Sequence, residues 1–219
     1  MKQLLLAAGA IALTVGTAVA QDQVYDWSGA YIGVQAGYGW GKAKYISPED
    51  GQSASPRPDG FLGGIYGGYN HQFANDFVLG IEGDVNISDS DGVSLFGPWP
   101  AFDSKFELKW SGAARIRLGY AVGRFLPFVA GGATAGRIIH DYAIAGLSPR
   151  VPRVGFEGTE LGWTVGAGVE YALTDKISTR VEYRYTDYGS KSYPDTLPAL
   201  PHSMSLKTSD LRIGIAYKF

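Results

Sequence analysis

The chain has no cysteine among its 219 residues, so disulfide bridges, thiol nucleophiles and thiolate metal sites are excluded. Charged residues make up only 18% of the chain, against a usual value of about 25%. The 19 basic and 21 acidic residues nearly cancel, and nucleic acid binding is not expected because it requires a basic surface. Beyond the first twenty residues the sequence also lacks an apolar run long enough for a transmembrane helix.

The N-terminus has the pattern of an export signal. Lys2 is followed by an uncharged stretch from Leu4 to Ala20, which ends in Ala18-Val19-Ala20. A positive start, an apolar centre and small residues before the cut are typical of a secretory signal peptide. We therefore expect residues 1–20 to be cleaved and residues 21–219 to form one exported domain. A membrane anchor is disfavoured, since the stretch is short for a spanning helix and rich in alanine and glycine.

Glycine and aromatic residues are abundant, with 31 glycines and 14 tyrosines, and this composition favours strands over helices. Apolar and polar or small residues alternate with a period of two, most clearly from Phe106 to Tyr120. No helix face would sort residues in this way. Strands are predicted at 31–40, 61–72, 77–86, 106–120, 126–138, 161–171, 179–185 and 211–219.

The connections between these strands alternate in length. Long connections rich in Pro, Ser, Gly and Asp are expected at 42–60, 87–104, 139–158 and 189–203, and short ones at 71–76, 121–125 and 174–176. An antiparallel up-and-down barrel places successive connections at opposite ends, so this pattern predicts an all-β, eight-stranded antiparallel up-and-down barrel. In a transmembrane barrel the four long connections would be extracellular.

The position of the aromatic residues favours a membrane barrel. On the apolar face they fall near the two ends of the strands, as in the interfacial girdles of an outer-membrane barrel. The alternative is a soluble lipid-carrying barrel, in which the apolar face points inward. The two expected girdles are Tyr38, Trp40, Phe61, Trp110, Trp163 and Tyr185 at the long-connection end, and Tyr69, Phe77, Tyr120, Tyr171, Tyr217 and Phe219 at the other.

Three segments carry a family resemblance: residues 26–33 (DWSGAYIG), residues 162–171 (GWTVGAGVEY) and the C-terminal strand from Leu211 to Phe219. They resemble the small alphaproteobacterial outer-membrane β-barrel family, which includes surface antigens, haemin-binding proteins and porin-like proteins. The resemblance implies an integral protein of the outer membrane of a Gram-negative bacterium. Tyr217 and the terminal Phe219 resemble the signal that the outer-membrane assembly machinery reads.

The charged residues of each strand lie at every second position, on the face opposite the apolar residues. This pattern predicts a charged lumen. Charges that cannot reach bulk water must pair, so a plug of salt bridges is expected. A narrow ion-conducting path is the alternative. The predicted lumen charges are Glu82, Asp84, Glu107, Lys109, Arg115, Arg117, Glu170, Arg180, Glu182, Arg184, Arg212 and Lys218.

Catalysis has little support in the sequence. His71, His140 and His202 lie outside any recognisable nucleophile or metal pattern, so we expect neither an enzyme nor a bound metal or cofactor. The haemin-binding branch of the family suggests His140 and His202 as candidate haem ligands.

Basic residues recur in the long connections, where lipopolysaccharide phosphates would lie: Lys42, Lys44, Arg57, Arg150 and Arg153. Acidic residues share these connections, so solvated loops are the alternative. The sequence thus predicts a non-enzymatic outer-membrane barrel with a structural envelope role, whose surface contacts membrane lipid, lipopolysaccharide or an external partner. A small porin-like diffusion channel and a haemin-binding surface receptor are the alternative functions.

Overall fold

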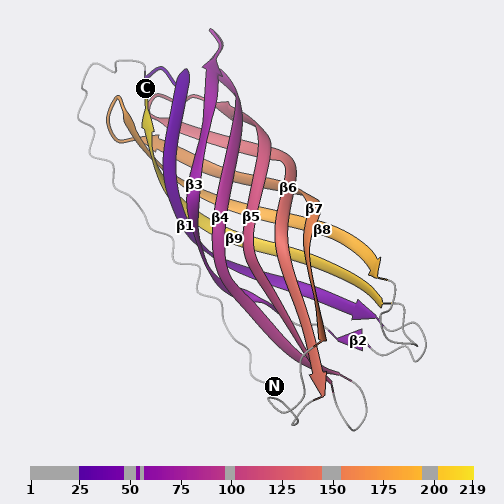
Figure 1. Ribbon diagram of the computed structural model, residues 1–219. Coiled ribbons are helices and arrows are strands. Elements are labelled where there is room, and N and C mark those ends of the chain that lie inside the picture. The colour runs from indigo at the N-terminus through magenta and orange to yellow at the C-terminus, as the bar shows by residue number, and fades with distance from the viewer. Residues whose placement is uncertain (1–24, 47–52, 55–56, 97–101, 145–153, 194–201) are drawn as a thin grey trace, which may run out of the picture.

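The computed structural model describes residues 25–46, 53–54, 57–96, 102–144, 154–193 and 202–219. Neighbouring strands are antiparallel and follow chain order, and the last pairs with the first, which closes the sheet into a barrel (Figure 1). The eight barrel strands are β1 (Gly29–Ile46), β3 (Asp59–Gln72), β4 (Phe77–Phe96), β5 (Phe102–Tyr120), β6 (Phe125–Ile144), β7 (Val154–Ala172), β8 (Ile177–Tyr193) and β9 (His202–Lys218). The two-residue strand β2 (Ser53–Ala54) pairs only with the end of β1. The predicted fold class is confirmed.

Three tight turns join the strands at one end of the barrel. They connect β3 to β4, β5 to β6 and β7 to β8, as the short connections predict. Asp76 and Gly123 occupy the left-handed region in two of these turns, with φ of 65° and 57°. Within the described residues, no helix combines the length and apolarity that crossing a membrane requires. The signal peptide expected at 1–20 lies outside the described residues and stays a prediction.

The strands extend further toward the long-connection end than the alternation indicates. β4 continues to Phe96 and β5 begins at Phe102, although residues 87–104 are expected to form a loop. The other three long connections are shortened in the same way. Irregular pairing between Ile87 and Ser90, and between Asp187 and Ser190, shifts the register there. At these two places backbone pairing continues past the shift while the period-two pattern breaks, so the alternation ends the predicted strands too early.

The faces of the sheet are sorted as a membrane barrel requires. On β4, Ile81, Val85 and Ile87 are 65%, 55% and 73% exposed, whereas Glu82 and Asp84 are buried. Aromatic rings contact one another on the outer surface near both ends, as in the pairs Tyr38–Phe61, Trp40–Tyr183, Phe77–Tyr120 and Tyr217–Phe219. The apolar face therefore points outward, which rejects the soluble barrel with an apolar interior.

One prediction about the faces is wrong. The alternation from Phe106 to Tyr120 puts Phe106 and Leu108 on the apolar face, which in a membrane barrel points outward, but Phe106 is buried inside the barrel with Leu108 packed beside it. The β5–β6 pairing is irregular between Leu108 and Trp110. The residues of β5 between this point and the long-connection end therefore change face. An apolar cluster consequently fills the interior near the long-connection end: Ala43, Phe106, Ile138, Tyr188 and Leu206.

The segment before β1 closes the opposite end of the barrel. Trp27 is 2% exposed; its backbone amide donates to the Gln72 side chain (2.8 Å) and its indole nitrogen to the Gly123 carbonyl (3.3 Å). Tyr25 packs edge-on against Trp27, with ring centroids 4.7 Å apart, and its burial raises its pKa to about 12. Lys218 lies 4.3 Å from the centre of the Tyr25 ring. The two aromatic residues pack against Val78 and Leu126 from the barrel wall.

Replacing Trp27 with alanine should destabilise the barrel by about 3 kcal/mol, because it removes a large buried side chain and the indole hydrogen bond to the Gly123 carbonyl. Urea unfolding of the refolded mature chain in detergent micelles, followed by far-ultraviolet circular dichroism, measures the loss. Leu173→Ala, in an adjacent turn and 52% exposed, is the matched control and should change little. Equal unfolding midpoints for the two variants would show that the segment before β1 does not close the barrel.

Candidate functional site in the barrel lumen

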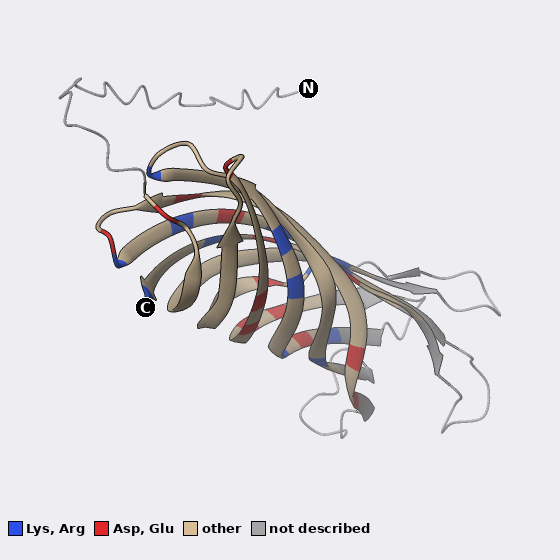
Figure 2. Cartoon of the chain, turned by 90° about the horizontal axis from the view of Figure 1, so that it is seen from above, with Lys and Arg blue, Asp and Glu red and all other residues tan. Residues whose placement is uncertain are grey.

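Charged side chains in the lumen come mainly from two opposite walls. β4 and β8 are four strands apart in either direction around the barrel, and β5 and β9 are likewise opposite. The inward parity of these strands brings acids and arginines into register on neighbouring strands: Glu82 with Arg115, Glu170 with Arg180, Glu182 with Arg212, and Arg184 with Asp210. Figure 2 shows these charges as red and blue segments along the strands themselves.

Glu82 is one centre of the network. Its carboxylate accepts hydrogen bonds from Arg115 of β5 and from Arg180 on the opposite wall, and Arg117 lies 3.9 Å away. The Tyr31 hydroxyl donates to the same carboxylate at 2.8 Å. Three guanidinium groups thus surround one acid.

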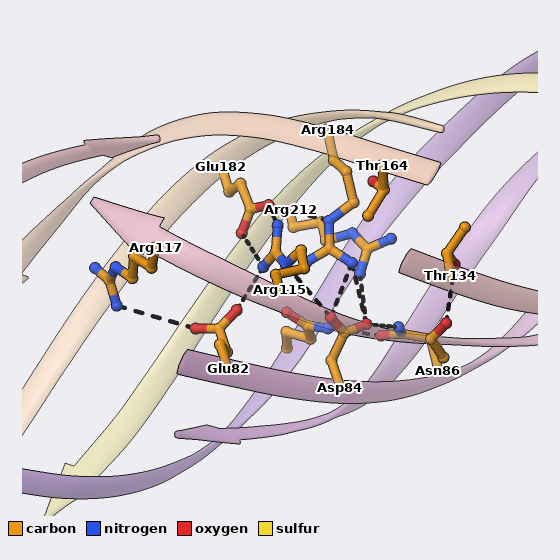
Figure 3. A network of polar contacts seen from close by, with 12 residues as sticks. Glu82, Asp84, Asn86, Arg115, Arg117, Thr134, Thr164, Glu182, Arg184 and Arg212 are labelled. Carbon is orange, nitrogen blue, oxygen red and sulfur yellow. Dashed lines mark hydrogen bonds and ion pairs between the residues drawn. The ribbon is translucent and has the colours of Figure 1, made fainter. Parts of the chain in front are cut away.

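Arg115 links the two walls, because it also donates to Glu182 of β8 (Figure 3). Glu182 in turn accepts a hydrogen bond from Arg184 at 3.0 Å. Arg184 reaches across the lumen to both carboxylate oxygens of Asp84, each at 3.0 Å. Ion pairs therefore cross the barrel at several points, among them Arg180–Glu82, Arg115–Glu182 and Arg184–Asp84.

The network is electrically balanced and buried. It contains five arginines and five acids, and its central side chains Arg115, Arg117 and Glu182 are fully inaccessible to solvent. Because burying an ion costs several kcal/mol, such groups are stable only when each one is paired. The members are Arg115, Arg117, Arg180, Arg184, Arg212, Glu82, Asp84, Glu170, Glu182 and Asp210.

Glycine and tyrosine on β1 and β3 complete the packing around the arginines. The Arg180 guanidinium lies 3.6 Å from the centre of the Tyr66 ring, a cation–π contact. Gly33 faces this ring, and a Cβ atom there would come within 2.6 Å of it. Gly33 is therefore required for the close approach of Tyr66 to the wall of β1.

Nine of the twelve predicted lumen charges lie in this network. Glu107 and Lys109 do not: they pair with each other beyond the irregularity in β5, where Lys109 is 51% exposed. Lys218 is also outside the network, because it lies at the turn end and donates to the Asp26 carbonyl. The alternating pattern misplaces Glu107 and Lys109 since it cannot register the inserted residue.

The alternating pattern does not identify several members of the site. Asp210 pairs with Arg212, and Gln35 bridges Arg180 (3.0 Å) and Asn86 (2.7 Å). Asp210 has the same parity as Arg212, so extending the C-terminal strand by one residue would have included it. Neutral Gln35 and Asn86 carry no charge signal, and only their inward parity marks them.

Above the network a small cavity of about 30 Å³ lies between Asp84, Arg184 and Arg212 on one side and Phe106 and Leu108 on the other. This volume suffices for about two water molecules. The apolar cluster around Phe106 covers the charged network from the long-connection end, as the Tyr25–Trp27 segment does from the turn end. The lumen is filled in three layers.

The candidate haem ligands lie on different walls. His140 belongs to β6 and His202 begins β9, with β7 and β8 between them, and their side chains lie outside the described residues. The structure does not test this prediction. Among the described residues, no group of three or more His, Cys, Asp or Glu side chains is arranged to hold a metal ion. Tyr217 and Phe219 are exposed on the outer face, and their recognition by the assembly machinery stays a prediction.

Comparison with known proteins agrees with this architecture. Residues 7–219 match the family model described as an outer membrane protein beta-barrel domain. A 25 kDa outer-membrane immunogenic protein of Brucella canis is 34% identical, covering 89% of this chain and 80% of the relative. A 22 kDa outer membrane protein of Rhizobium leguminosarum bv. viciae is also 34% identical, covering 89% and 79%. The outer membrane protease OmpT of Escherichia coli has a similar fold, with a TM-score of 0.52 at 10% identity over 87% of this chain and 97% of OmpT.

Replacing Arg115 with glutamine should destabilise the barrel by about 3 to 5 kcal/mol, because it leaves Glu82 and Glu182 without their shared partner. The matched control is Arg137→Gln on β6, which breaks a pair with Glu157 whose side chains are about half exposed. The control should unfold at the same urea concentration as the native barrel, since exposed pairs contribute little. Equal effects of the two substitutions would contradict a buried network.

Proposed function

Because the chain belongs to the outer membrane protein beta-barrel family, as the family model and its curated relatives show, we propose that it is a closed, non-conducting structural barrel of the outer membrane. Its role would be to stabilise the envelope and to present extracellular connections to the surroundings. The cross-lumen network supports this proposal most directly, since it joins opposite walls with buried ion pairs. Conduction would require these pairs to separate.

The three layers of the lumen support a closed state over a diffusion channel. A permeant ion would have to pass the Tyr25–Trp27 segment, the arginine–carboxylate layer and the apolar cluster around Phe106. An eight-stranded barrel has just enough interior for side chains to fill, without a water column. A barrel tied together internally is also rigid, which suits a structural element in the membrane.

A non-enzymatic role is part of the proposal. The likeness to OmpT supports a shared fold alone, because the two chains are only 10% identical. The buried acids Glu82 and Glu182 are each held by two or more arginines, so they are poorly suited to accept a proton from a substrate. The Brucella relative is described as immunogenic, which supports exposure of this chain's extracellular connections at the cell surface.

The refolded mature chain should be electrically silent in a planar lipid bilayer. A variant that removes two arginines and two acids from one layer (Glu82, Arg115, Arg180 and Glu182 to serine), combined with Trp27→Ala and Phe106→Ala, should conduct in discrete steps because all three layers are opened. Heat-dependent gel mobility checks folding of every protein. Arg137→Ser with Glu157→Ser, also charge-neutral but outside the lumen, should remain silent. Reproducible conductance steps from the native barrel would overturn the proposal.

A further inference from the structure

Three cations lie side by side on the outer face at the long-connection end. Lys42 of β1 is the direct register partner of Lys207 of β9. On the other side, the Gly41 amide donates to the Pro58 carbonyl (2.7 Å), and Trp40 pairs with Asp59. The same register places Arg57 beside Lys42. All three residues are exposed, and the row crosses three adjacent strands or their extensions.

Such a row is unfavourable by itself, because like charges directly opposite one another on neighbouring strands destabilise a sheet. Lys207 forms an ion pair with Asp187 of β8 at 3.1 Å. Asp59 lies two residues from Arg57 along the chain, and its carboxylate accepts a hydrogen bond from the Tyr38 hydroxyl. Among the described residues no acid pairs with Lys42 or Arg57, so the centre of the row is open to an external anion.

The position of the row identifies the kind of anion. Two residues below Lys42 lies Trp40, 46% exposed, whose ring is 6.3 Å from that of Tyr183 in the aromatic girdle. Aromatic girdles mark the level of the membrane interface, so the row lies at the height of the lipid headgroups. Because the long connections of such barrels are extracellular, this is the outer leaflet.

The same seam offers space for an acyl chain below the girdle. A groove of about 330 Å³ follows β1 and β9 on the outer surface. It forms where the small Ala36 lies among the larger Val34, Ile213 and Ile215. Lys42 is six residues further along β1, about 20 Å at 3.3 Å per residue. Cations, aromatic rings and groove thus follow one another along a single path.

We infer that the β1–β9 seam binds a phosphorylated lipid of the outer leaflet, the lipid A part of lipopolysaccharide. A phosphate group lies over Arg57, Lys42 and Lys207, and an acyl chain occupies the groove at Ala36. Arginine and lysine form strong charge-assisted hydrogen bonds with phosphate. The inference is independent of conduction, since all of these residues lie on the outside of the barrel.

Native mass spectrometry of the refolded barrel, titrated with lipid A in detergent micelles, tests this inference. The native barrel should retain one lipid A per chain. Arg57→Gln, Lys42→Gln and Lys207→Gln together should weaken binding about 100-fold, since each basic residue near a membrane surface contributes about fivefold. The control variant Lys105→Gln, Lys109→Gln and Arg137→Gln removes the same charge from β5 and β6, and should bind lipid A as the native barrel does.

Two further probes separate the sources of binding. Dephosphorylated lipid A should bind the native barrel as weakly as lipid A binds the triple variant. Phosphatidylglycerol, a phospholipid with one phosphate, should also bind more weakly. Equal loss of binding in the control variant, or equal binding of dephosphorylated lipid A, would overturn the inference. Gel mobility confirms folding, and without lipid the triple variant should be at least as stable as the native barrel because the repulsion is removed.

Discussion

Pairing of buried charge across the lumen is the constraint on which the rest of the barrel depends. Arg115 and Arg184 each hold an acid on another wall, so β4 and β5 are tied to β8 across the interior. Removing these ions from water is costly, and it is offset only when every partner is present. The acids and arginines must therefore be equal in number, although they lie up to 128 residues apart in sequence, as Arg212 and Asp84 do.

That constraint explains which features the sequence could predict. Period-two alternation places a residue inside or outside, so the closed barrel and nine of its lumen charges follow from local pattern alone. It does not predict partners, because the contacts join strands such as β4 and β8 that never pair through their backbones. It also fails at Glu107, Lys109 and Phe106, where one inserted residue reverses the faces. Asp210 was missed because the predicted strand began one residue too late.

The glycine content has its reason in the same lumen. Long arginine side chains and the Tyr66 ring fill the narrow interior. The wall facing them must therefore carry residues without a side chain. At Gly33 a Cβ atom would collide with that ring, and at Gly166 it would lie 2.6 Å from a Glu182 carboxylate oxygen. The low fraction of charged residues and the high glycine content thus have one cause, because a few large charged side chains in the lumen are surrounded by the smallest available residues.

The inner and outer charges follow opposite rules because their surroundings differ. Inside, neither water nor free ions reach Arg115 or Glu182, so the chain must supply every counter-charge itself. On the outer surface, at the level of the Trp40 girdle, the membrane supplies anions, and a row such as Arg57, Lys42 and Lys207 can remain only partly neutralised by the protein. The paired charges of the interior stabilise the barrel. The partly neutralised cations of the outer rim remain available to bind the anionic groups of the surrounding lipid.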